Sequence, residues 1–147
     1  MKNPDKLWYD TCRRFAEQSQ CLSRQVGCVI VHENHQISQG WNGAPEGSCT
    51  SNCPRAKCQS NTGKSGDELD LAICSHAEIN AIGYCSRHGI STRGSTLYCT
   101  TVPCYYCAGA IIASGIEEVV YDVDYPGSES SKKAFVNAKV KCRKFFT

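Results

Sequence analysis

The chain has 147 residues, of which 41% are hydrophobic and 20% are charged, as in ordinary globular domains. Its formal net charge of +2 at pH 7 argues against a nucleic-acid partner, because nucleic-acid-binding domains are usually strongly basic. The sequence has no apolar run near the roughly 18 residues that cross a membrane, and its start, MKNPDKLWYD, does not resemble a signal peptide. We therefore expect one domain over residues 1–147, cytoplasmic and without a membrane partner.

The first part of the chain predicts a helix followed by two paired strands. Residues 5–19 carry apolar side chains at helical spacing, and Pro4 with Asp5 is a typical helix start. Residues 25–32 (QVGCVIVH) and 36–41 (QISQGW) have the composition of strands, and the residues between them form the predicted turn.

The second part alternates between helices and strands. We expect Ser75 near the N-cap of the first of these helices and Gly115 at the end of the second. Such alternation predicts an α/β layered domain. The predicted helices are 75–87, 104–115 and 129–138, and the predicted strands are 95–102, 116–122 and 139–146.

Cysteine is unusually frequent, with 12 residues in the chain. In a reducing cytosol, cysteine pairs bind metals or take part in catalysis more often than they form disulfides. Residues 43–74 form a polar, cysteine-rich stretch with few apolar side chains, and a loop of this length is usually functional or disordered. Five other cysteines lie in predicted helices and strands and are expected in the core, where free Cys is common: Cys12, Cys28, Cys85, Cys99 and Cys142.

Two short motifs together predict a zinc site. Catalytic zinc takes three protein ligands and keeps a position for water, and His76, Cys104 and Cys107 could supply them. Cys104 and Cys107 are three residues apart at a predicted helix start, so they share one face. The unpaired N–H groups and the helix dipole there favour the thiolate, which is the form that binds metal.

Glu78 is the predicted catalytic acid and base. At the start of a helix its carboxylate can take a proton from a water whose pKa zinc lowers to about 7, and can pass that proton to a leaving nitrogen. The pattern H-x-E with P-C-x-x-C is the signature of zinc-dependent nucleobase deaminases. The alternative, a helix-capping histidine with two core thiols, would compete only if one of the two motifs stood alone.

Residues 7–125 resemble the deoxycytidylate (dCMP) deaminase family, most specifically in GWNGAPEG and HAEINAI. The resemblance implies a three-layer α/β/α cytidine-deaminase-like fold with a central five-stranded mixed sheet. It also implies zinc-dependent hydrolysis of dCMP to dUMP and ammonia, which supplies dUMP for thymidylate synthesis.

The resemblance also suggests how the substrate is held. It implies that Asn42 contacts the sugar and that backbone groups at Ala77 and Cys104 hold the pyrimidine. By itself, the Asn42-Gly43 pair would be read as a turn former. Ser23 and Arg24 are candidates for the phosphate, since arginine binds phosphate in a forked geometry, but Arg24 fits a solvated loop charge equally well.

The resemblance further implies a second, structural zinc bound by Cys21, Cys49 and Cys74, with Cys53 as the preferred fourth ligand and Cys58 as the alternative. Such a clamp can fold a polar loop. The alternative is a mobile loop with free thiols.

Family members form oligomers, commonly hexamers, so a homo-oligomer (hexamer or dimer) is expected, with Arg87 as an interface candidate or simply an exposed helix end. A dCTP or dTTP effector, with Mg²⁺ accompanying the allosteric nucleotide, would also fit the family.

Three other functions remain open from the sequence. The chain could deaminate a wider range of cytosine nucleotides, including dCTP and CMP. It could be a tRNA adenosine deaminase, although such enzymes favour a basic surface. It could also be a non-catalytic, zinc-stabilised nucleotide-binding module, which would have no use for Glu78.

Overall fold

The computed structural model describes residues 3–21, 23–44 and 74–146. Most of the predicted cysteine-rich loop, including Cys49, Cys53 and Cys58, lies outside these residues. The elements are α1 (Pro4–Ala16), β1 (Gly27–His32), β2 (His35–Trp41), α3 (Ala77–His88), β3 (Thr96–Thr101), α4 (Tyr105–Ala113), β4 (Glu118–Val123), α5 (Glu129–Asn137) and β5 (Lys141–Lys144).

The strands form one five-stranded mixed sheet in the order β2-β1-β3-β4-β5. Strand β1 runs antiparallel to both β2 and β3, while β3, β4 and β5 run parallel to one another. The parallel pairs need crossover connections, which α4 and α5 provide between consecutive strands. The predicted mixed sheet is therefore confirmed.

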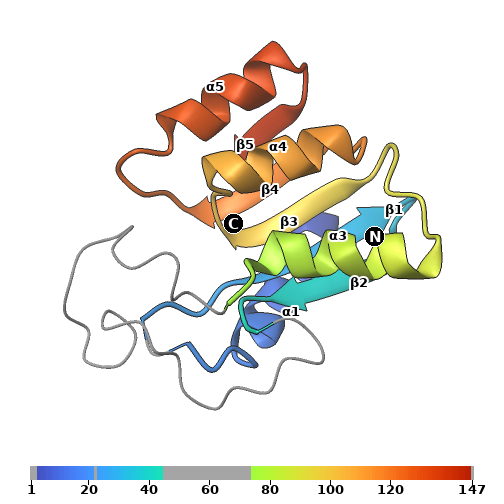
Figure 1. Ribbon diagram of the computed structural model, residues 1–147, viewed down its shortest axis with the longest axis vertical. Coiled ribbons are helices and arrows are strands. Elements are labelled where there is room, and N and C mark those ends of the chain that lie inside the picture. The colour runs from blue at the N-terminus through green and yellow to red at the C-terminus, as the bar shows by residue number, and fades with distance from the viewer. Residues whose placement is uncertain (1–2, 22, 45–73, 147) are drawn as a thin grey trace.

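Helices cover both faces of the sheet (Figure 1). One core cluster joins inward-facing residues of the sheet, such as Cys28, Leu97 and Val119, to α3, α4 and α5. The neighbouring strand residues point the other way, and Val29 and Tyr98 pack with α1 in a second cluster. This alternation is the period-two pattern of a strand, and it confirms the three-layer α/β/α architecture.

The five cysteines expected in the core lie in or beside it. Cys12, Cys28, Cys85 and Cys99 are buried, as predicted, whereas Cys142 is half-buried and packs against the larger cluster. Cys142 is less covered because β5 lies at the edge of the sheet, where one side of the strand has no neighbour.

Ser75 lies directly before the N-cap of α3, as predicted, but it is not itself part of the helix. Helix α3 begins two residues later, with His76 as its N-cap. Ser75 instead forms an isolated antiparallel bridge with Gly43, through two backbone hydrogen bonds of 2.8 and 3.1 Å. This pairing takes the backbone groups of Ser75 out of the helix and brings the two ends of the cysteine-rich loop together. Gly115 ends α4, as predicted: Ser114 is the C-cap residue, and Gly115 follows it in the left-handed conformation with a φ of 79°.

A glycine lets α3 approach the sheet very closely. A Cβ added to Gly40 on β2 would lie 2.2 Å from the carbonyl oxygen of Ala77 and 2.8 Å from the backbone nitrogen of Ala81, distances that no real Cβ tolerates. Two side-chain hydrogen bonds hold the same contact, from Ser38 to the Ala81 carbonyl and from Asn80 to the Trp41 carbonyl, each 2.8 Å. The start of α3 is therefore fixed against β2.

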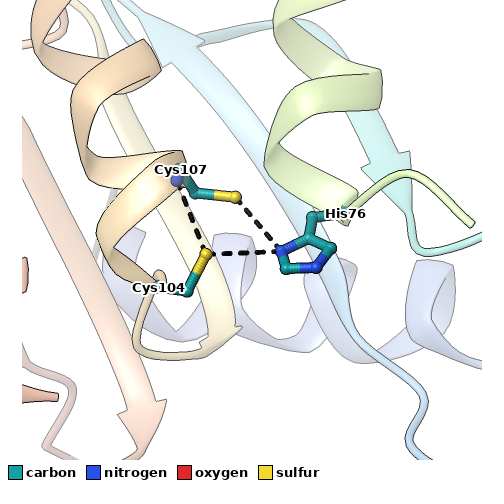
Figure 2. Close-up of side chains that lie close together, drawn as sticks. All are labelled: His76, Cys104 and Cys107. Carbon is teal, nitrogen blue, oxygen red and sulfur yellow. Dashed lines mark hydrogen bonds between the residues drawn. The ribbon is translucent and has the colours of Figure 1, made fainter. Parts of the chain in front are cut away.

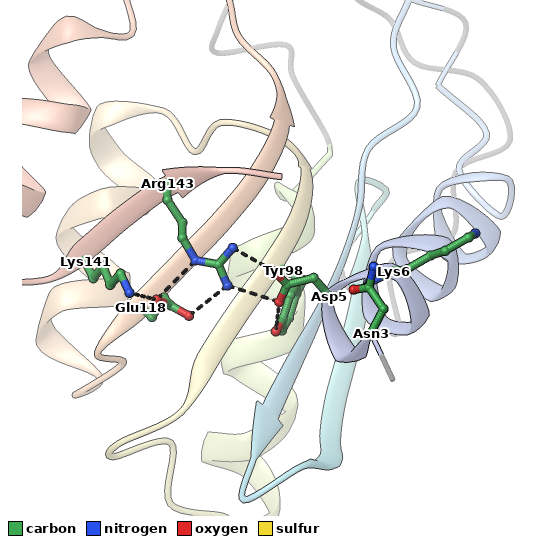
Figure 3. Close-up of polar contacts among 7 residues, drawn as sticks. All are labelled: Asn3, Asp5, Lys6, Tyr98, Glu118, Lys141 and Arg143. Carbon is green, nitrogen blue, oxygen red and sulfur yellow. Dashed lines mark hydrogen bonds and ion pairs between the residues drawn. The ribbon is translucent and has the colours of Figure 1, made fainter. Parts of the chain in front are cut away.

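An ionic network joins the beginning of the chain to its last strand (Figure 3). Arg143 on β5 donates two hydrogen bonds to Asp5 on α1, of 2.7 and 3.0 Å, and two to Glu118 on β4. Tyr98 donates a further hydrogen bond of 2.8 Å to Asp5.

In the part of the chain that the structure describes, no helix is both long enough and apolar enough to cross a bilayer.

Candidate metal and active site

The N-termini of two helices meet beside the carboxyl end of β3. His76 is the N-cap of α3 and Cys104 is the N-cap of α4, where its Sγ accepts a hydrogen bond from the backbone N–H of Cys107. Figure 2 shows His76 facing both cysteines from the opposite helix. The open end of a parallel sheet strand is where α/β proteins commonly bind ligands.

The three side chains are spaced for a metal ion. Their potential ligand atoms all lie within 4.8 Å of one another, and Nδ1 of His76 is 3.5 Å from the Sγ of Cys104 and 3.3 Å from that of Cys107. Tetrahedral zinc, with Zn–S near 2.3 Å and Zn–N near 2.0 Å, separates sulfur from nitrogen by about 3.5 Å. The donor set and its spacing therefore fit zinc.

The three side chains of the cluster differ in how far they are buried. Cys107 is buried, Cys104 is half-buried and His76 is exposed. A metal held by these three side chains would consequently be accessible from the His76 side. Three protein ligands with an open side are typical of catalytic rather than structural zinc.

The electrostatics of the cluster favour a thiolate at Cys104. A hydrogen bond from the Cys107 thiol, and then the interaction with His76, lower the pKa of Cys104 to about 4. The pKa of Cys107 is raised because it donates to that thiolate and is buried, while the hydrogen bond with Cys104 raises the pKa of His76. The lowered pKa of Cys104 therefore favours an anionic ligand at the position where a cation would bind.

Glu78 lies beneath this cluster in the first turn of α3, with only 4% of its surface exposed. Its Oε2 is 3.5 Å from Cys107 Sγ and its Oε1 accepts a hydrogen bond of 3.3 Å from Cys99 Sγ. Burial raises the pKa of the Glu78 carboxyl. A carboxyl group whose pKa is raised above its ordinary value holds a proton more readily, as a group that both accepts and donates protons in catalysis must.

Asn42 is engaged with the backbone beside the site. Its Oδ1 accepts from the N–H of Val26 and its Nδ2 donates to the carbonyl of Arg24, both at 2.8 Å. Ser19 in turn donates to the Asn42 carbonyl. Because a carboxamide has two donors and two acceptor sites, Asn42 keeps one of each after these contacts.

Tyr125, in the segment between β4 and α5, was not anticipated from the sequence. Its ring lies 5.9 Å below the guanidinium carbon of Arg24. Burial, and then the negative charges of Cys104 and Glu78, raise the pKa of the Tyr125 hydroxyl. The structure therefore brings Arg24 to the side of the site on which Tyr125 lies.

The remaining predicted site residues are spread around this cluster. Ala77 is fully buried, Ser23 is half-buried, and Arg87 is exposed in the last turn of α3. Of the proposed ligands of a second zinc, Cys21 and Cys74 are half-buried, while Cys49, Cys53 and the alternative Cys58 lie outside the described residues.

A sequence profile of the cytidine and deoxycytidylate deaminase zinc-binding region matches residues 2–123. The chain belongs to this deaminase family. Its metal is accordingly zinc, for which the donor set of His76, Cys104 and Cys107 is suited. The family assignment, made most specifically from GWNGAPEG and HAEINAI, is confirmed.

Named relatives fall in the same family. The chain is 36% identical over 144 residues to deoxycytidylate deaminase of Schizosaccharomyces pombe, covering 96% of this chain and 44% of the relative. It is 42% identical over 120 residues to deoxycytidylate deaminase of Mycobacterium phage D29, covering 80% of this chain and 92% of the relative. The chain thus spans less than half the length of the fission yeast relative and most of the phage one.

A solved structure extends the likeness to three dimensions. The dCMP deaminase of cyanophage S-TIM5, in complex with dCMP and dUMP, superposes with a TM-score of 0.80 and 26% sequence identity, and the match covers 95% of each chain. This agreement supports the cytidine-deaminase-like fold that the sequence predicted.

Proposed function

We propose that the chain catalyses the zinc-dependent hydrolytic deamination of dCMP to dUMP and ammonia. The observation that carries the proposal is the buried Glu78 carboxyl beside a cluster of one imidazole and two thiol groups. A purely structural zinc site has no use for such a carboxyl, whereas a deaminase needs one to move protons. The family and the two dCMP deaminases of phages support this substrate.

His76, Cys104 and Cys107 would hold the zinc ion. When bound, zinc lowers the pKa of water toward about 7 and so makes a nucleophile available at neutral pH. Glu78 would take one proton of the attacking water and deliver it to N3 of the cytosine. It would then take the second proton, from the new hydroxyl group on C4, and deliver it to the departing amine. Its position beneath the cluster leaves it close to Cys107 and shielded from bulk water.

The surroundings of the site support the remaining contacts that we propose with substrate. The unused donor and acceptor of Asn42 would be available to the sugar, and backbone groups at Ala77 and Cys104 would hold the pyrimidine. Arg24, in cation–π contact with Tyr125, would bind the phosphate with Ser23 beside it. Arg24→Gln is then expected to raise KM for dCMP while leaving turnover of deoxycytidine unchanged; an equal effect on both substrates would exclude the phosphate role.

Ammonia release by the zinc-replete protein tests the function directly. The substrates to compare are dCMP, CMP, dCTP, deoxycytidine and a tRNA anticodon stem-loop. Preferential turnover of dCMP is expected. Comparable turnover of dCTP or CMP would indicate a broader nucleotide enzyme, activity on RNA alone would indicate a tRNA deaminase, and no turnover with zinc bound would favour a nucleotide-binding module.

Glu78→Gln separates catalysis from metal binding. We expect this variant to lose about 10²–10⁴-fold in kcat while it keeps its zinc and its melting temperature. Glu117→Gln, the same change at an exposed position, is the control and should behave like the unmodified chain. Undiminished turnover by Glu78→Gln would refute the proposed role of this residue.

The second zinc of Cys21, Cys49, Cys74 and Cys53 or Cys58 stays a prediction, and so do the homo-oligomer, a dCTP or dTTP effector with Mg²⁺, the single-domain organisation and a cytoplasmic location. Zinc stoichiometry would test the first of these. Two zinc ions per chain are expected, and a single ion would leave only the site of His76, Cys104 and Cys107.

A further inference from the structure

A buried thiol lies on the sheet directly under the proposed catalytic carboxyl. Cys99, in the middle of β3, has 1% of its surface exposed, and its Sγ donates to Oε1 of Glu78 over 3.3 Å. Leu97, two residues earlier on the same strand, points into the same cluster. Cys99 therefore reaches Glu78 from the rigid centre of the sheet, and α3 carries Glu78 on the other side of the contact.

The two oxygens of Glu78 have different neighbours. Oε1 contacts Cys99, whereas Oε2 lies 3.5 Å from Cys107. A thiol that binds zinc does so as the thiolate, so Cys107 has no proton to donate when the metal is held. Of the side-chain contacts described for Glu78, the hydrogen bond from Cys99 is the one that would persist when the metal is bound.

A carboxyl with one oxygen held is oriented for proton transfer. The terminal torsion of glutamate is broad and roughly two-fold, so a buried carboxyl without a fixed partner can turn its oxygens away from the reacting groups. Proton transfer depends on hydrogen-bond geometry, and small displacements of a catalytic group are costly to the rate.

We propose that Cys99 is a positioning residue for the deaminase reaction. Its S–H group holds Oε1 of Glu78 and thereby directs Oε2 toward the metal cluster and the substrate. This inference rests on the proposed function, since it assigns Cys99 a role in the same proton transfers. Cys99 itself touches neither substrate nor metal.

The alternative is that Cys99 only fills space in the core, and the chain contains a matched control for that role. Cys28 on β1 is the direct partner of Cys99 in the β1–β3 register, has 0% of its surface exposed and lies in the same cluster. Among the described contacts Cys28 makes no side-chain hydrogen bond to Glu78, although the Glu78 charge adds to the burial that raises the pKa of Cys28. Replacing either cysteine by alanine removes a buried sulfur from the same core layer.

The kinetic test compares Cys99→Ala, Cys99→Ser and Cys28→Ala with the unmodified chain in their zinc-loaded forms. We expect Cys99→Ala to lower kcat about 10–100-fold, as is usual when a partner of a catalytic group is removed, with KM and zinc content unchanged. Cys99→Ser keeps a donor and should recover most of the loss. Cys28→Ala should lower the melting temperature as much as Cys99→Ala does, with kcat retained.

An infrared test measures the contact without relying on turnover. The S–H stretching band that disappears in Cys99→Ala belongs to Cys99, and a carboxylate acceptor shifts it to lower frequency. In Glu78→Gln the acceptor becomes a neutral amide, so this band should move to higher frequency.

The outcomes of these tests distinguish failure of the positioning role from failure of the proposed function. Equal kcat values for Cys99→Ala and Cys28→Ala, or no rescue by serine, would overturn the positioning role, as would a Cys99 band that does not move in Glu78→Gln. If the unmodified chain turns over no cytosine nucleotide at all, the proposed function fails instead, and the infrared band still decides whether Cys99 holds Glu78.

Discussion

The chemistry of the site depends on residues placed at two helix starts. His76 and Cys104 are N-caps, and Cys107 and Glu78 follow within the first turns. The backbone N–H groups of a helix start favour an anion, and at Cys104 one of them, the N–H of Cys107, donates to Sγ. Burial instead raises the pKa of Glu78, and the hydrogen bond to Cys104 raises that of Cys107. Because His76 and Cys104 come from different helices, the cluster forms only when α3 and α4 are both docked on the sheet.

Cys104→Ser tests the metal assignment at this scale. Serine is a poor zinc ligand compared with a thiolate, so the variant should lose one bound zinc ion per chain and its deaminase activity. Elemental analysis of the purified protein measures the zinc. Cys142→Ser, at a half-buried cysteine on β5 that is not part of the cluster, is the control and should keep all of its zinc. Full zinc content in Cys104→Ser would contradict the assignment.

At the scale of elements, the close contact between α3 and β2 positions two of the site residues. The backbone of Ala77 lies against Gly40, and the flanking His76 and Glu78 are the proposed metal ligand and catalytic base. Gly27 has the same relation to α1, since a Cβ there would lie 2.2 Å from the carbonyl oxygen of Cys12. Both helices thus pack against backbone rather than against side chains.

Gly40→Ala should therefore impair both stability and catalysis. The added methyl group must push α3 away from β2, which we expect to lower the free energy of unfolding by about 1–3 kcal/mol and to reduce kcat. Urea unfolding and steady-state kinetics measure the two effects. Gly83→Ala, within α3 but with nothing near its added Cβ, should be neutral or stabilising by up to about 1 kcal/mol; similar losses in both variants would exclude the packing explanation.

At the scale of the whole molecule, the Asp5–Arg143 ion pair joins the first helix to the last strand. Both side chains are only partly exposed, at 24% and 32%, and Arg143 also binds Glu118 on β4. Hydrogen bonds with Arg143 lower the pKa of Asp5 below its ordinary value of 3.8. Charged hydrogen bonds of this kind contribute roughly 1.5–3 kcal/mol.

Asp5→Asn should expose this contribution through its pH dependence. The folded-state pKa of Asp5 is depressed, so its stabilising effect is complete above 3.8 and is lost as the pH falls through the lower folded-state value. The melting temperature of the variant should be lower than that of the unmodified chain at neutral pH, and the difference should shrink below pH 3.8.

The control for this measurement lies on the same helix. Asp10 forms an ion pair with Lys6 in which both side chains are at least half exposed, and such pairs contribute about 0–1 kcal/mol. Asp10→Asn should change the melting temperature little at any pH. A pH-independent effect of Asp5→Asn would show that its carboxylate charge is not what holds α1 to β5.

The sequence alone determined the parts of the protein that depend on local spacing. Cys104 and Cys107 are separated by one helical turn, and the strands and helices follow from hydrophobic periodicity, so these could be read without knowing the fold. The five-stranded mixed sheet and the family also follow from the sequence, and both are confirmed. The predicted helix 75–87 starts two residues early, because the backbone of Ser75 pairs with Gly43, a residue far away in the chain.

Only the tertiary structure decided which distant side chains surround the site. Cys99 was expected to be an ordinary core residue, and its contact with Glu78 depends on how α3 docks over β3. The hydrogen bonds of the Asn42 side chain with the backbone of Arg24 and Val26 likewise join separate segments, and so does the cation–π contact between Arg24 and Tyr125. The physical reason is that local spacing along the sequence decides which side chains are neighbours within one helix or strand. Contacts between elements depend instead on strand register and on how the helices dock, and packing of the whole core determines both.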